Sequence, residues 1–175
     1  MSLRPLFCYH YTMQTHRILA IDPGYERLGI AVIEKEQNER ETLVYSDCFK
    51  TSAKLAFTER LKLLGEEIER LIDQHKPSAL AIEKLFFNSN QKTAMQVSEV
   101  RGALLFIALS RGLAIYEYTP LEIKVAVTGD GKSDKGRVTV MIPKLIRLEK
   151  QIRHDDEYDA IAIGLTCFAH KKLEN

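Results

Sequence analysis

Three apolar runs near the start of the chain predict β-strands. They cover residues 18–21, 28–33 and 43–49, and they are separated by turn-like or polar segments, the first of which contains Gly24. Strands joined by short connections pair in antiparallel fashion, because a parallel pair needs a long crossover. We therefore expect an antiparallel meander of three strands.

Apolar residues at helical spacing follow this meander. One helix is predicted from Phe57 to a stop at Pro77, before a strand at 79–82, and a second from about 92 to 111, which Gly112 ends before a strand at 113–118. The inward positions are Leu61, Leu64, Ile68, Leu71 and Ile72 in the first helix, and Val97, Val100, Leu104 and Ile107 in the second. The later elements are mainly helical. This order indicates an α/β domain with a five-stranded mixed sheet, flanked by helices and joined by right-handed crossovers.

The length and composition favour one domain without a linker. A chain of 175 residues with 45% hydrophobic content can bury one substantial core, which we place in residues 17–172. Residues 1–16 form a leader that differs from the rest, because a clear strand begins at Arg17 and Met13 is an alternative start. We expect this leader to be either disordered or an artefact of the assigned start.

The cysteines and the apolar stretches indicate a cytoplasmic protein. Cys8, Cys48 and Cys167 are widely separated, odd in number and without metal-ligand spacing, which is typical of reduced thiols. The apolar patch from Leu6 to Tyr11 is too short for a secretory signal or a membrane span. No membrane association is therefore expected.

The charge is small overall but unevenly distributed. A net charge of +1 argues against a protein that coats nucleic acid through bulk charge. Residues 120–153 nevertheless carry a net charge of +4, from eight bases (Lys124, Lys132, Lys135, Arg137, Lys144, Arg147, Lys150 and Arg153) and four acids (Glu122, Asp130, Asp134 and Glu149). This stretch is either a face that meets phosphate or an ordinary solvated helix surface.

Four acids stand at the ends of apolar elements. Asp22 and Glu83 each end a predicted strand, and their side chains would meet at one rim of the sheet if those strands were neighbours. Asp156 and Asp159 open the last helix, where their i, i+3 spacing places them on one face. Separately, these acids are explained as a turn aspartate, a strand-end charge and N-capping residues. A single metal site explains all four together.

Such a cluster has a definite chemistry. Close carboxylates repel one another, so they remain ionised together only around a cation, and hard oxygen ligands select Mg²⁺ or Mn²⁺. Two such ions, about 4 Å apart, activate a water molecule and stabilise the leaving oxygen in phosphodiester hydrolysis. We therefore predict a two-metal nuclease centre.

Three segments resemble one known family in order and in spacing. These are Ile18-Leu-Ala-Ile-Asp-Pro-Gly, Ala81-Ile-Glu-Lys-Leu-Phe-Phe and Asp156-Glu-Tyr-Asp-Ala-Ile-Ala-Ile, with Val100-Arg-Gly-Ala-Leu between them. They are similar to the RuvC family of Holliday junction resolvases, and the similarity runs from about Arg17 to His170. The resemblance implies a ribonuclease H-like fold and a homodimer that makes paired, Mg²⁺-dependent cuts in four-way DNA junctions during recombination and repair. It also implies RuvA and RuvB as branch-migration partners.

The resemblance assigns roles to individual residues. The catalytic and metal-binding quartet falls on Asp22, Glu83, Asp156 and Asp159. The DNA-binding positions are Phe86, which would stack on unpaired bases, and the basic residues Lys124, Lys135 and Arg137. The alternatives are a core phenylalanine and solvated basic side chains. Family members commonly carry small residues between the last two acids, whereas this chain has Glu157 and Tyr158 there.

Neighbouring groups and rival functions leave other interpretations open. Asp155 offers a competing ligand beside Asp156, and His154 is either a further base or ligand or, more simply, a solvated histidine. The segment from Asp22 to Gly29 also resembles the first phosphate loop of actin-like and sugar-kinase folds, although the chain is short for two such domains. A catalytically inert junction-binding protein is the other alternative. A P-loop ending at Gly129-Asp-Gly-Lys-Ser is excluded because Ala126 stands where that motif needs glycine.

Overall fold

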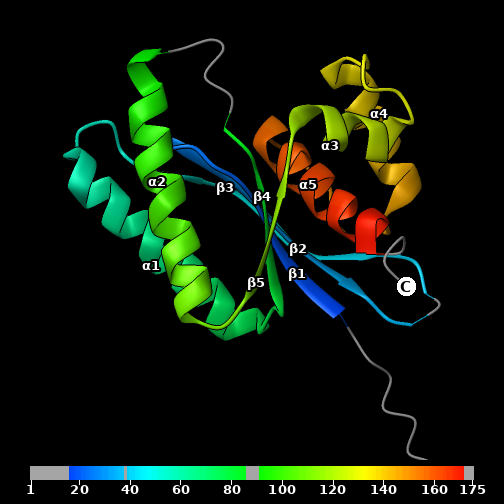
Figure 1. Ribbon diagram of the computed structural model, residues 1–175, viewed down its shortest axis with the longest axis horizontal. Helices are drawn as coiled ribbons and strands as arrows, with labels where there is room; N and C mark the ends of the chain where they lie inside the picture. Colours follow the sequence, from blue (N-terminus) through cyan, green and yellow to red (C-terminus); the bar gives the residue numbers. More distant parts are fainter. Residues whose placement is uncertain (1–15, 38, 86–90, 172–175) are drawn as a thin grey trace, which may run out of the picture.

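The computed structural model describes residues 16–37, 39–85 and 91–171. Within them, a five-stranded sheet is flanked by helices on both faces (Figure 1). The strands are β1 (His16–Asp22), β2 (Arg27–Lys35), β3 (Thr42–Lys50), β4 (Ala79–Glu83) and β5 (Ala114–Tyr118). The helices are α1 (Phe57–His75), α2 (Gln91–Ser110), α3 (Pro120–Thr128), α4 (Lys135–Leu145) and α5 (Asp155–Lys171).

The sheet is mixed, with the strand order β3-β2-β1-β4-β5. The two short connections make β1, β2 and β3 an antiparallel meander, as predicted. Helix α1 carries the chain across to β4, which pairs in parallel with β1, and α2 carries it on to β5. The strands that end in Asp22 and Glu83 are therefore central neighbours, which was the condition for their side chains to meet.

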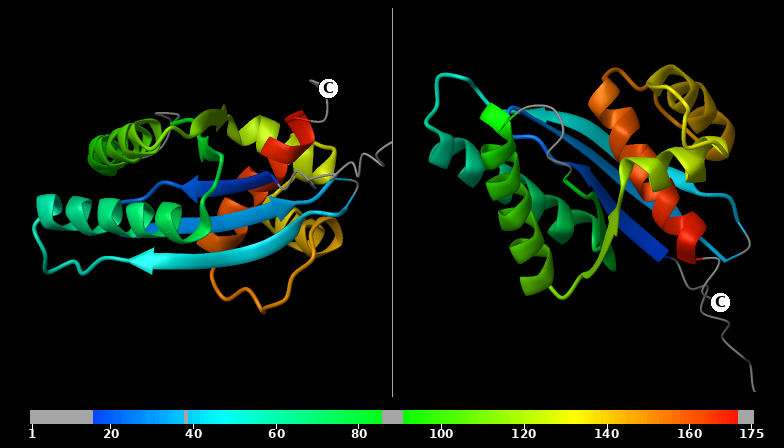
Figure 2. Two further views of the ribbon diagram at one scale, coloured as in Figure 1. Left: turned by 90° about the horizontal axis from the view of Figure 1, so that it is seen from below. Right: turned by 45° about the horizontal axis from the view of Figure 1, so that its top comes forward.

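The alternation of side chains along each strand separates two apolar cores. Leu19 and Ile21 of β1 face α1 and α2, whereas Ile18 and Ala20 face α5. Both cores are formed by buried apolar residues. Helices α1 and α2 thus cover one face of the sheet, and α5, with α3 and α4 outside it, covers the other (Figures 1 and 2).

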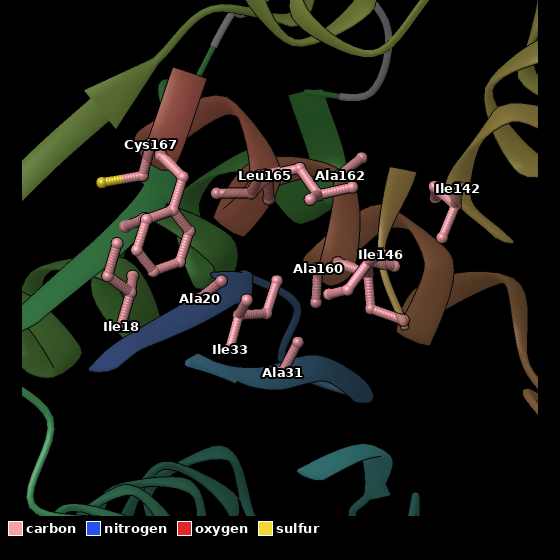
Figure 3. Packing of buried hydrophobic residues seen from close by; sticks show 14 of the residues in the cluster. Ile18, Ala20, Ala31, Ile33, Ile142, Ile146, Ala160, Ala162, Leu165 and Cys167 are labelled. Atoms are coloured by element: carbon pink, nitrogen blue, oxygen red, sulfur yellow. The ribbon is translucent and has the colours of Figure 1, made fainter. Parts of the chain in front are cut away.

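Small residues on the α5 face let this helix lie close to the sheet. Ala20 and Ala31 lie under α5, and Ala160 is on the side of this helix that faces the sheet (Figure 3). A Cβ atom added at Gly164 would lie 2.6 Å from Cδ1 of Ile33, closer than such atoms approach. The depth at which α5 sits, and with it the position of the acids at its start, is therefore set by side-chain size.

The predicted elements agree with the structure to within a few residues at each end. In α2, Val100 and Leu104 are buried as expected, whereas Val97 and Ile107 are only half-buried and Ala108 is buried instead. Helix α1 ends at the expected place, because Lys76 takes a left-handed conformation with φ of +49° just before Pro77. Residues 1–15 lie outside the described residues, so the leader and the single domain over 17–172 stay predictions.

Candidate active site

Asp22 and Glu83 lie side by side at one rim of the sheet. The parallel register pairs Ile21 with Ile82, so the next residues along β1 and β4 are the two acids. Both fall on the face that α5 covers, because they continue the alternation of Ala20 and Ala81. The end of β4 is held by a further contact, a 3.1 Å hydrogen bond from Nε of Arg101 to the carbonyl oxygen of Glu83.

Helix α5 brings the other two acids toward this rim. Asp159 lines one pocket together with Asp22 and Glu83. Asp156, one turn earlier, does not belong to the described lining of that pocket, but its charge acts on Asp22. The rim of the sheet and the first turn of α5 thus gather the predicted quartet, with Asp156 at its margin.

The carboxyl group of Asp22 is electrostatically strained. Burial, followed by the charges of Asp159, Glu83 and Asp156, raises its pKa from 3.8 to about 7. Burial and the charge of Asp159 also raise the pKa of Glu83. Acids in this state have a stronger preference for a neutralising cation than exposed acids have.

Two lysines approach the acids from α3 and α4. Lys124 and Lys135 line the same pocket, and Nζ of Lys135 donates a 2.8 Å hydrogen bond to Oδ2 of Asp159. Burial acts to lower the pKa of Lys135, but Asp159, Asp155 and Asp22 raise it above its ordinary value. Lys135 therefore stays an ammonium group within the acidic cluster.

Asp156 is held by groups from β2 and β3. Its Oδ2 lies 3.6 Å from Nη1 of Arg27 and accepts a 3.3 Å contact from Sγ of Cys48. Its carbonyl oxygen lies against Gly29, where an added Cβ would come within 2.2 Å of it. Gly29 stands between Asp22 and Cys48 in the register of the three strands, so a larger residue there would push the start of α5 away from Asp22.

The donor set suits a hard divalent cation. Among the described residues, no three His, Cys, Asp or Glu side chains already form a group that could hold a metal ion. Asp159 and Asp156 instead face protein cations, Lys135 and Arg27. The four carboxylates fit Mg²⁺ or Mn²⁺, because these ions prefer oxygen ligands. Such a cation would also relieve the repulsion between the carboxylates that contributes to the raised pKa of Asp22.

Arg137, Asp155 and His154 are not among the residues that line the pocket. Arg137 is exposed, and its Nη1 lies 3.6 Å from Oδ2 of Asp130. Asp155 is largely exposed and lies 3.7 Å from Nζ of Lys135, so it shares that lysine with Asp159. The backbone N–H of His154 donates to Glu157 at the start of α5. Phe86 lies outside the described residues.

Sequence reasoning missed three residues that position the acids. Gly29 and Arg101 stand in segments already noted for their resemblance, but no role followed from their type. Cys48 was set aside with the other cysteines. Each of these residues acts through a contact with an acid from a distant part of the chain. The local sequence does not show such a contact.

Comparison with known proteins decides the family. Residues 18–167 match the sequence model described as "Crossover junction endodeoxyribonuclease RuvC". The chain belongs to the RuvC family. The RuvC protein of Alkaliphilus metalliredigens is 43% identical over 153 residues, which cover 87% of this chain and 92% of that protein. The RuvC protein of Finegoldia magna is 38% identical over 149 residues, which cover 85% and 90%.

Solved structures agree with this assignment. Thermus thermophilus RuvC in complex with a Holliday junction substrate matches with a TM-score of 0.84 and 28% identity, over 91% of this chain and 96% of that one. The yeast mitochondrial resolvase Ydc2 matches with a TM-score of 0.70 at 12% identity, over 90% and 79%, which shows a common fold. The predicted ribonuclease H-like fold and the predicted class, a metal-dependent crossover junction endodeoxyribonuclease of the RuvC family, are confirmed.

None of the helices in the described part of the chain is both long enough and apolar enough to cross a membrane.

Proposed function

We propose that this RuvC-family chain cuts four-way DNA junctions by Mg²⁺-dependent hydrolysis, with Asp22, Glu83, Asp156 and Asp159 as metal ligands. The observation that carries the proposal is the state of Asp22, whose pKa is raised to about 7 by burial and by the three other acids. Four carboxylates that are buried and repel one another are unfavourable unless a cation neutralises them, and we infer that a cation does so in the working enzyme.

The acids and the lysines of the site have different roles at the scissile phosphate. When bound, two Mg²⁺ ions, or Mn²⁺ in their place, would activate a water molecule and stabilise the leaving oxygen. The quartet would hold these ions at the rim of the sheet. Lys135 and Lys124, on the wall of the same pocket, stabilise negative charge as it develops on the phosphate. No covalent nucleophile from the protein is required.

The DNA contacts extend beyond this pocket. We assign Arg137, which is exposed on α4, to a phosphate near the cut strand, and Phe86 to stacking on unpaired bases at the crossover. The related Thermus thermophilus RuvC has been solved with a Holliday junction substrate. Because the substrate is DNA, we place the protein in the cytoplasm, with RuvA and RuvB as partners on the strength of the family.

An exposed apolar stripe on α2 supports a homodimer. Met95, Phe106 and Leu109 are 70%, 71% and 62% exposed, although all three are large and apolar. At 100° per residue they fall on one face of the helix, together with Gly102, where an added Cβ atom would meet nothing within 4 Å beyond the adjacent backbone of the helix. Two symmetric cuts need two active sites. We therefore propose that this face of α2 packs against a second copy of the chain.

Cleavage of a synthetic mobile four-way junction tests the proposed function. The wild-type protein should cut the junction with Mg²⁺ and only bind it with Ca²⁺. Asp22→Asn should keep binding and lose cutting by at least about 10³-fold, because one metal ligand is neutralised. Asp73→Asn, an exposed acid of α1, is the matched control and should cut normally. Binding without any incision by the wild type would favour the inert junction-binding alternative.

A further inference from the structure

Glu157 is a buried acid between two proposed metal ligands. Only 3% of its surface is exposed, although Asp159 after it lines the pocket and Asp156 before it lies at the margin of the acidic cluster. Its Oε2 accepts hydrogen bonds of 2.6 Å from Oγ of Ser46 and 2.8 Å from Nζ of Lys150. The side chain therefore faces β3 and not the pocket rim.

The second oxygen of the same carboxylate holds the backbone at the start of α5. Oε1 of Glu157 accepts from the backbone N–H groups of Arg153 at 3.2 Å and His154 at 3.3 Å. A glutamate at the third helical position often binds back in this way, since the first N–H groups of a helix have no partner within it. Four donors thus converge on one buried carboxylate.

These contacts join three segments that are distant in sequence. The connection between α4 and α5 runs beside the edge strand β3, where Arg147 exchanges backbone hydrogen bonds with Glu41 and Leu43 at 3.0 Å each. Farther along, Nζ of Lys150 donates to the carbonyl oxygen of Ser46 at 2.5 Å. Glu157 closes this arrangement, because it binds Ser46 of the strand and Lys150 of the connection together.

The same strand also contacts the neighbouring metal ligand. Ser46 and Cys48 are two residues apart on β3, so their side chains share the face toward α5, and Sγ of Cys48 contacts Oδ2 of Asp156 at 3.3 Å. The first turn of α5 is therefore fixed from β3 at two consecutive residues, Asp156 and Glu157. A movement of this turn would displace both proposed ligands on α5 together.

We propose that Glu157 is a positioning residue, which with Ser46 and Lys150 fixes the first turn of α5 so that Asp156 and Asp159 meet the metal ions in productive geometry. The inference rests on the metal assignment made above. It concerns a group outside the pocket that acts through its neighbours. Substitution of groups that orient metal ligands typically weakens metal affinity or activity by about 10- to 100-fold.

Mn²⁺ binding to the full chain, measured by electron paramagnetic resonance, distinguishes a positioning role of Glu157 from a contribution to stability alone. Glu157→Gln should weaken Mn²⁺ binding by about 10-fold, because the amide presents a donor where four donors converge. Ser46→Ala should act in the same direction and more weakly. The control is Glu59→Ala, which removes the equivalent helix-start contact of α1, a 2.9 Å hydrogen bond from the Ala56 N–H, far from the acids. It should lower the melting temperature without changing Mn²⁺ binding.

A double-mutant cycle completes the test. If the Ser46 hydroxyl acts through Glu157, the double variant should bind Mn²⁺ no more weakly than Glu157→Gln alone. Unchanged affinity in both single variants would overturn the inference, and Ser46→Ala decides the matter if Glu157→Gln does not fold. Absence of Mn²⁺ binding by the wild type would instead overturn the metal assignment itself, so the two failures are distinguishable.

Discussion

Nζ of Lys135 lies 2.8 Å from Oδ2 of Asp159, which joins a cation of α4 to an acid of α5 inside the candidate site. The ammonium group thereby occupies a place among carboxylates that a metal ion would share. Lys135 is thus expected to compete with the metal for Asp159 and to stabilise charge during the reaction. These two roles predict opposite effects of its removal.

Lys135→Met should lower the cleavage rate at saturating Mg²⁺ by about 10²-fold, because the developing charge loses one stabilising donor. Mn²⁺ affinity should rise a few-fold, since Asp159 is released and the cluster gains net negative charge. Single-turnover cleavage and Mn²⁺ titration measure the two effects separately. Lys132→Met, an exposed lysine in the same basic stretch, should leave both quantities unchanged, and a loss of metal affinity in Lys135→Met would contradict the assigned competition.

The raised pKa of Asp22 predicts a pH-dependent stability in metal-free protein. The folded state keeps the proton up to about pH 7, whereas the unfolded carboxyl loses it near pH 3.8. The contribution of Asp22 to stability is therefore fully present below about pH 4 and is lost as the pH rises to about 7. Asp22→Asn should be more stable than wild type at pH 8, by about 2–4 kcal/mol, and equally stable at pH 4.

Chemical denaturation at the two pH values in the presence of a chelator measures this difference. Adding Mg²⁺ should raise the stability of the wild type and not of Asp22→Asn, because a ligand stabilises only the state that binds it. Asp73→Asn controls for the loss of one negative charge. Equal stability of Asp22→Asn and wild type at pH 8 would show that Asp22 is not strained.

Gly29→Ala should damage the site without touching an acid side chain. The added Cβ would lie 2.2 Å from the carbonyl oxygen of Asp156, so the start of α5 must shift away from β2. We expect a stability loss of about 1–3 kcal/mol and, because small misplacements of catalytic groups are costly, a fall in cleavage of about 10²-fold. Gly65→Ala, where the Cβ meets only the tip of Ile107, is the control. Equal cleavage by both variants would contradict this account.

The α2 stripe predicts a specific effect on assembly. Phe106→Glu should convert the protein from twice the chain mass of 20.0 kDa to a single chain in light scattering, because a buried unpaired charge opposes the interface. Val140→Glu, at a similarly exposed apolar position on α4, should leave the mass unchanged. A dimeric Phe106→Glu would place the interface elsewhere.

The sequence alone determined the elements and the identity of the acids. Alternation and helical spacing report which residues face a core, and an acid directly after an apolar strand, as at Asp22 and Glu83, must emerge at the end of the sheet. The family followed from the same segments. These features are local, so they are readable before the chain is folded.

Tertiary structure decided how the acids are held. The pairing of Lys135 with Asp159, the clearance that Gly29 gives to Asp156 and the burial of Glu157 against Ser46 each join residues far apart in the chain. Sequence patterns report the burial of a side chain but not the group it meets across a core, because that contact depends on how closely α5 packs on the sheet. The placement of the proposed metal ligands is therefore a property of the whole fold.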